Sequence, residues 1–205
     1  MKYQIIKFIL IFSLITLSSQ TDISKVLILF FSRPGENYSV GKVEIGNTEL
    51  IANYIKNVTN ADIYKINPKE KYPESYSETL IRAKNELDKN LRPEIISPLN
   101  DIKKYDIIFL GYPIWYEHLP KIVVNQLEKL DFKGKTIIPF NTHEGSEIGN
   151  SIDDIKNIVN NDCIVKNGFP QQGSFIRNNI DKMEENTLKW INQNIGMKKN
   201  QNNEL

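Results

Sequence analysis

The sequence alternates short apolar runs with longer segments whose apolar residues recur at helical spacing. The apolar runs cover residues 25–31, 61–66, 106–110, 136–140 and 162–166. The run at 106–110 is nearly continuous, which is typical of a strand that is covered on both faces. Strands that alternate with helices form parallel sheets with right-handed crossovers. The alternation therefore predicts an α/β domain with a parallel five-stranded sheet, although it allows several strand orders.

The intervening segments predict the helices that connect these strands. Apolar residues recur every three or four positions in segments 49–57, 75–88, 151–159 and 181–194. Another helix is expected to begin near Pro120, because proline suits the first turn of a helix. The amphipathic spacing places one face of each helix on the sheet.

The two ends of the chain are expected to lie outside this domain. Lys2 and Lys7 form a basic region that precedes an apolar core at residues 8–17, and Ser18-Ser19-Gln20 follows the core. This is the pattern of a secretory signal peptide, and the core is short for a membrane span. We therefore expect a signal peptide at 1–20, a single domain at 21–196 and a polar tail at 197–205. This pattern predicts a secreted or extracytoplasmic protein. The alternatives are an uncleaved N-terminal segment that tethers the protein to a membrane, and an additional N-terminal helix.

Charge and cysteine content exclude several classes of function. The 205 residues are 40% hydrophobic, which suits one domain, and the net charge of +1 gives no basic surplus for a nucleic acid. The single cysteine, Cys163, excludes an intrachain disulfide and argues against a cysteine-based zinc or iron–sulfur site. Its apolar neighbours predict a buried strand residue. We expect no metal, no nucleic-acid partner and no membrane association after signal removal.

The first apolar run leads into a loop with the features of an anion site. The run ends at Ser32, and about fifteen residues at 33–47 separate it from the next helix. Gly46-Asn47-Thr48 opens that helix, where backbone N–H groups are unpaired and the helix dipole favours an anion. Ser32 and Thr48 could add hydroxyl donors, so the stretch predicts a phosphate-bearing ligand. The alternative is that Asn47 or Thr48 only caps the helix.

Two later loops follow the third and fourth apolar runs. The first reads Gly111-Tyr112-Pro113-Ile114-Trp115-Tyr116, and its two aromatic residues could stack on a flat ring or pack in the core. The second covers residues 141–151 and contains glycines, which let the backbone approach a planar ligand closely.

These three loops, in this order, resemble those of the flavodoxin-like proteins, and the similarity covers residues 25–195. The resemblance implies a doubly wound sheet of order 2-1-3-4-5, helices on both faces and a ligand beyond the carboxyl ends of the strands. It also implies noncovalent FMN. The implied cofactor-binding residues are Ser32, Arg33, Gly46, Asn47, Thr48, Pro113, Ile114, Trp115, Tyr116, Thr142, His143, Glu144, Gly145 and Ser146.

His143 and Glu144 are the candidates for a catalytic role. Family members often have a small residue where Glu144 stands, and a carboxylate there would disfavour an anionic reduced flavin by Coulomb repulsion. His143 could offset this charge or donate a proton to a substrate. The alternative is that both side chains are solvated.

Together these features predict an FMN-binding redox protein that passes electrons through its flavin. Its expected partner is a redox protein or a small-molecule electron donor or acceptor, such as NAD(P)H or a quinone. One alternative is an enzyme, an FMN-dependent NAD(P)H:quinone or nitro-compound reductase. Another is a secreted binding module without flavin, which Glu144 and the long first loop would permit. The oligomeric state is left open.

Overall fold

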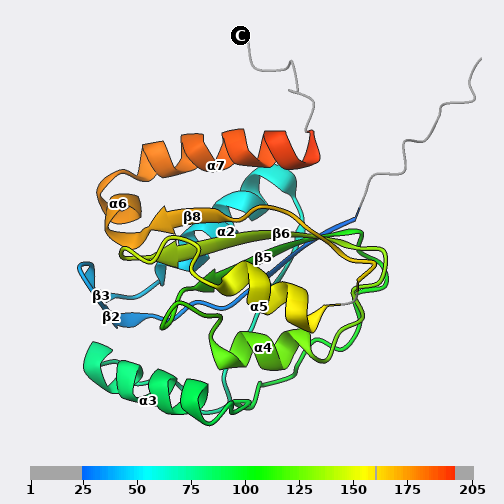
Figure 1. Ribbon diagram of the computed structural model, residues 1–205. Coiled ribbons are helices and arrows are strands. Elements are labelled where there is room, and N and C mark those ends of the chain that lie inside the picture. Colours follow the sequence, from blue (N-terminus) through cyan, green and yellow to red (C-terminus); the bar gives the residue numbers. More distant parts are fainter. Residues whose placement is uncertain (1–24, 160, 197–205) are drawn as a thin grey trace, which may run out of the picture.

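The computed structural model describes residues 25–159 and 161–196 (Figure 1). The predicted signal peptide at 1–20, the first residues of the predicted domain and the polar tail at 197–205 lie outside the described residues. None of the described helices is long and apolar enough to cross a membrane.

A parallel sheet forms the centre of the fold, in the order β4-β1-β5-β6-β7. This order confirms the predicted 2-1-3-4-5 arrangement. The strands are β4 (Asp62–Lys65), β1 (Val26–Phe30), β5 (Ile107–Pro113), β6 (Thr136–His143) and β7 (Ile164–Val165). Because β1 and β5 are neighbours from Val26↔Ile107 to Phe30↔Gly111, the loops that follow them emerge side by side.

Helices cover both faces of the sheet, as predicted (Figure 1). One layer contains α2 (Asn47–Thr59) and α7 (Ile180–Ile195), and the other contains α3 (Tyr76–Asp88), α4 (Lys121–Leu127) and α5 (Ser151–Ile158). Successive residues of β1 point to opposite layers. Leu29 belongs to the core cluster on one face, while Ile28 and Phe30 belong to the cluster on the other.

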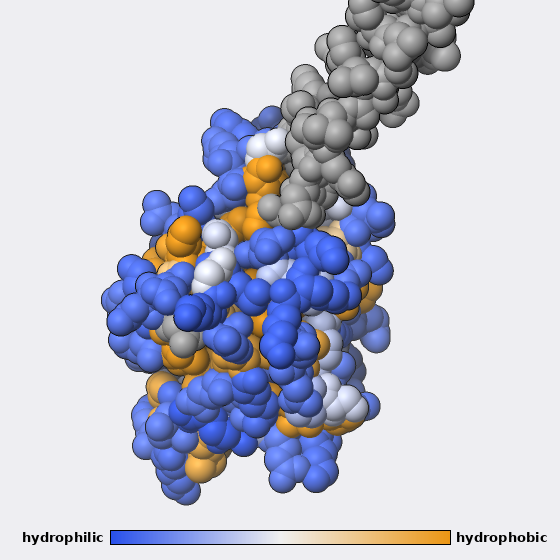
Figure 2. Space-filling model, turned by 90° about the vertical axis from the view of Figure 1, so that its right-hand side faces the viewer, coloured by the Kyte–Doolittle hydropathy of each residue, from blue (hydrophilic) through white to orange (hydrophobic). Residues whose placement is uncertain are grey.

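One face of the molecule is largely polar. Figure 2 shows one face on which hydrophilic residues predominate and apolar residues lie mainly in narrow gaps between them. This distribution is normal for a globular domain whose large apolar side chains are buried.

Three parts of the structure were not predicted. The first loop contains a hairpin of β2 (Gly35–Asn37) and β3 (Gly41–Val43). The backbone has a positive φ of 56° at Ser39 in the turn and of 84° at Gly41, where β3 begins. Strand β8 (Phe169–Gln172) pairs with β6 beyond the short β7, so it adds a sixth strand to the five predicted. Helix α6 (Gly173–Asn178) follows β8 directly.

Cys163 lies just before β7 and is half-buried, not inside the strand as predicted. Desolvation by burial raises the pKa of its thiol to about 11. Roughly one thiol in a thousand is therefore ionised at pH 8, and alkylation by iodoacetamide should be much slower than that of N-acetylcysteine. The rate should increase with pH until about 11. Equal rates for the protein and the small thiol at pH 8 would contradict this expectation.

Candidate functional site

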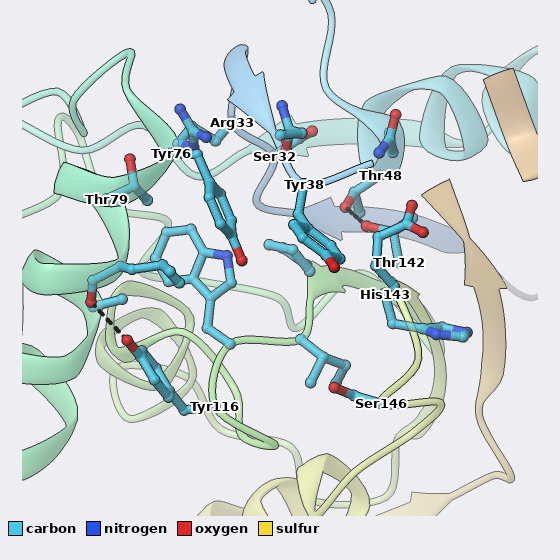
Figure 3. Close-up of a pocket in the computed structure, with 18 residues that line it drawn as sticks. Ser32, Arg33, Tyr38, Thr48, Tyr76, Thr79, Tyr116, Thr142, His143 and Ser146 are labelled. Atoms are coloured by element: carbon cyan, nitrogen blue, oxygen red, sulfur yellow. Dashed lines mark hydrogen bonds between the residues drawn. The ribbon is translucent and has the colours of Figure 1, made fainter. Parts of the chain in front are cut away.

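A cavity of about 370 Å³ lies where the three predicted loops meet (Figure 3). Its size falls in the range of small-molecule sites. Of the predicted cofactor-binding residues, all but Gly46 and Gly145 line it. The lining residues that sequence reasoning missed are Asn37, Tyr38, Tyr76, Thr79, Leu80 and Ala83.

The cavity has a polar end at the beginning of α2. Gly46 is the N-cap residue and provides no side-chain cap, while the Glu49 amide donates to Ser32 Oγ at 3.2 Å. The amides of Asn47 and Thr48 make no hydrogen bond to any described residue. Because neither Asn47 nor Thr48 caps the helix with its side chain, the capping alternative is wrong. Two free amides and the helix dipole remain to attract an anion.

Gly46 permits this geometry because the end of β1 passes directly against it. A Cβ atom at position 46 would lie 2.2 Å from Ser32 Oγ and 2.6 Å from the carbonyl oxygen of Arg33. No larger residue fits without moving the loop.

Thr48 and Thr142 connect the first and third loops. Both residues are buried, and their Oγ1 atoms lie 2.7 Å apart, joined by a dashed line in Figure 3. One hydroxyl donates to the other, so one hydroxyl hydrogen remains available to a ligand at this end of the cavity.

Arg33 was predicted to be a cofactor-binding residue and lines the cavity, but its guanidinium contacts backbone carbonyl groups. Nη1 donates to the carbonyl oxygens of Pro34 at 3.0 Å and Pro73 at 2.9 Å, and Nη2 donates to that of Glu36. Burial lowers the pKa of this guanidinium. Arg33 thus anchors the β2–β3 hairpin to the segment before α3.

Aromatic side chains form the other end of the cavity. The Trp115 ring packs edge-on against Tyr72, with centroids 4.9 Å apart, and against Phe31 at 5.5 Å. Trp115 therefore packs on the core and also lines the cavity, while its stacking on a flat ring stays a prediction. Tyr116 is 40% exposed, adopts a φ of 51° and donates from its hydroxyl to the Leu80 carbonyl at 3.2 Å.

Two tyrosines that sequence reasoning missed complete this end. Tyr38 in the hairpin turn and Tyr76 at the start of α3 stack with centroids 5.7 Å apart. The Tyr76 amide donates to the Glu36 carboxylate at 2.9 Å, which fixes the hairpin against α3. Figure 3 shows Ser32, Thr48 and Thr142 at one end of the cavity and Tyr76 and Tyr116 at the other.

The two candidates for chemistry in the third loop, His143 and Glu144, line the cavity, but their polar atoms are engaged by other groups of the protein. The His143 side chain is only 5% exposed, and its Nδ1 accepts from the Gly145 amide at 3.1 Å. Its ring points away from Tyr76 and Tyr116 in Figure 3. The Glu144 carboxylate accepts from the Ser174 amide at 2.6 Å and from the Ser174 hydroxyl at 2.9 Å. Both groups are thus held by the protein, which differs from the solvated alternative.

The comparisons agree with this architecture. A sequence model of a family described as Flavodoxin matches residues 37–193. A protein from Bacteroides eggerthii, provisionally named a flavoprotein, has a structure that is 28% identical with a TM-score of 0.64, covering 85% of this chain and 99% of that one. A similarly named protein from Bacteroides uniformis is 25% identical with a TM-score of 0.62, covering 82% and 97%.

A more distant structure shares the fold. A flavoprotein from Lactobacillus acidophilus, in complex with FMN, is 20% identical with a TM-score of 0.54 and covers 78% of this chain and 98% of its own. No curated protein matches this sequence.

Proposed function

Because this chain belongs to the flavodoxin family, we propose that it binds FMN noncovalently in the cavity and passes electrons through it. The observation that carries the proposal is the division of the cavity into two chemically different ends. The unpaired amides of α2 and the hydroxyl groups of Thr48 and Thr142 lie at one end, and aromatic side chains lie at the other. FMN has the same division between its phosphate and its ring system.

The polar end fits a phosphate group. The free amides of Asn47 and Thr48 can donate to phosphate oxygens, and the hydroxyl pair of Thr48 and Thr142 can provide a further donor. Gly46 lets the end of β1 pack directly against the start of α2, because its position has no space for a side chain.

The aromatic end fits a flat, mostly apolar ring. Trp115 is held at a fixed angle by Tyr72 and Phe31, so it can present its ring without further loss of conformational freedom. Pro113 and Ile114 line the same side of the cavity and help to exclude water. Bound FMN would supply the redox chemistry, while these residues orient it.

Retention of flavin is the direct test of the proposal. Protein loaded with FMN and passed through a desalting column should remain yellow, with flavin and protein in equal amounts. Colourless protein after loading would favour the binding module without flavin. Steady-state oxidation of NADPH by the FMN-loaded protein would show a reductase, whereas reduction only by a redox protein would show an electron carrier.

Trp115 should report flavin binding through its fluorescence. If the ring stacks on the flavin, adding FMN to the apoprotein should strongly quench emission, and Trp115→Phe should remove most of that response. Trp190→Phe is the matched control, because Trp190 stacks on Phe169 at 4.6 Å in the other core cluster. Quenching that depends on Trp190 and not on Trp115 would refute the stacking role.

A further inference from the structure

Helix α6 connects the first loop of the cavity to the third. From its C-terminal half, Arg177 donates through Nε to Asn47 Oδ1 at 2.7 Å and through Nη2 to the Ile45 carbonyl oxygen. At its N-terminus, the Ser174 amide and hydroxyl donate to the Glu144 carboxylate. One short helix thus holds a residue on each side of the cavity.

The packing around α6 leaves these contacts little freedom. Ile176 is fully buried and fixes the helix to the core. A Cβ atom at Gly173 would lie 2.3 Å from Asn47 Nδ2 and 2.9 Å from Glu144 Oε1, so the Gly173 backbone is packed between the two loop side chains. A shift of α6 would therefore move Asn47 and the turn before α2.

Charge favours a role for this helix at the polar end of the cavity. The Arg177 guanidinium contacts the turn that presents the free amides of Asn47 and Thr48. It is half-buried, which lowers its pKa, although an arginine remains a cation at neutral pH. By contrast, the donors of Arg33 are directed to carbonyl groups around the hairpin.

We propose that Arg177 is the positioning residue of the phosphate site. It holds Asn47 and the Ile45 carbonyl so that the first amides of α2 face the phosphate, and it places a positive charge behind them. Glu144 acts indirectly, because its carboxylate accepts from Ser174 and so fixes the N-terminus of α6, the helix that contains Arg177. The inference rests on the proposed FMN binding, and it assigns phosphate selectivity to a residue that does not line the cavity.

The test compares the dissociation constants of FMN and riboflavin, measured by titration calorimetry for each variant. Riboflavin has the same ring but lacks the phosphate. Arg177→Met should weaken FMN binding by about 10- to 100-fold, because the displaced amides of Asn47 and Thr48 would lose hydrogen bonds to the charged phosphate. Riboflavin binding should weaken by less than about 3-fold. Arg177→Lys keeps the charge and should recover part of the FMN affinity, and added salt should reduce that recovery.

Arg92→Met is the matched control, because Arg92 is also half-buried and pairs with Glu128 at 2.7 Å, but does not contact the cavity loops. It should change neither dissociation constant. Thermal unfolding of each apoprotein separates a loss of folding from a loss of binding. If Arg177→Met weakens both ligands equally, or neither, the assignment is overturned while FMN binding itself stands. If the unmodified protein binds neither ligand, the proposed function fails.

Discussion

Replacing Gly46 with alanine should weaken FMN binding by about 100-fold or more, which corresponds to about 2.7 kcal/mol. The added Cβ would meet Ser32 Oγ at 2.2 Å and the Arg33 carbonyl oxygen at 2.6 Å. The serine hydroxyl could rotate away, but the carbonyl belongs to the backbone that leaves β1. The start of α2 must therefore shift, and its two free amides would no longer converge on one anion. Titration calorimetry with FMN measures the effect.

The stability of the Gly46→Ala variant should fall by about 1–3 kcal/mol, as for other overpacked sites. Gly134→Ala is a suitable control, because a Cβ there meets no atom within 4 Å and only the φ of 70° is strained. This control should lose some stability and keep its FMN affinity. FMN affinity within about threefold of that of the unmodified protein in Gly46→Ala would show that the phosphate binds elsewhere.

The sequence predicted the elements whose patterns are long and local. The runs that became β1, β5 and β6 are continuous apolar segments, and the helices α3 and α7 have several turns of regular spacing. Ser32 and Thr48 could be placed at the cavity because the end of a strand and the beginning of a helix are visible in the sequence. The strand order needed the family resemblance, since alternation alone does not determine which strands pair.

The parts that were missed depend on short elements and distant contacts. Strand β8 has 4 residues and α6 has 6. These lengths are too short to show the alternation of a strand or the roughly 3.6-residue period of a helix. Arg177 contacts Asn47 across 130 positions, and no local pattern relates them. The positions of Arg33 and Glu144 at the cavity were predicted, but the directions of their side chains were not. The neighbouring carbonyl and amide groups determine those directions.

The second large effect is expected at Glu86, which supports the aromatic end of the cavity from within α3. This residue is 4% exposed, and its carboxylate accepts from the Tyr72 hydroxyl at 2.8 Å and from Arg82 Nε at 2.8 Å. The Arg82 guanidinium lies 4.0 Å from the centre of the Tyr72 ring. Glu86→Ala would leave the buried Tyr72 hydroxyl without its acceptor and would remove the nearest carboxylate from Arg82. The largely buried Arg82 guanidinium would keep the carbonyl oxygens of Glu70 and Lys71 and the more distant Glu70 carboxylate at 3.7 Å. Removing one member of a buried pair costs about 3–5 kcal/mol.

We expect the free energy of unfolding of Glu86→Ala to fall by about 3 kcal/mol, near the lower bound because Arg82 can reach water. Asp88→Ala is the matched control, since Asp88 also pairs with a basic residue on α3, Lys84, but both side chains are about half exposed. Urea denaturation should show a loss below about 0.5 kcal/mol for this exposed pair. Because Tyr72 packs against Trp115, Glu86→Ala should also weaken FMN and riboflavin equally. Equal losses of stability in the two variants would mean that the Glu86 pair contributes no more than a surface ion pair.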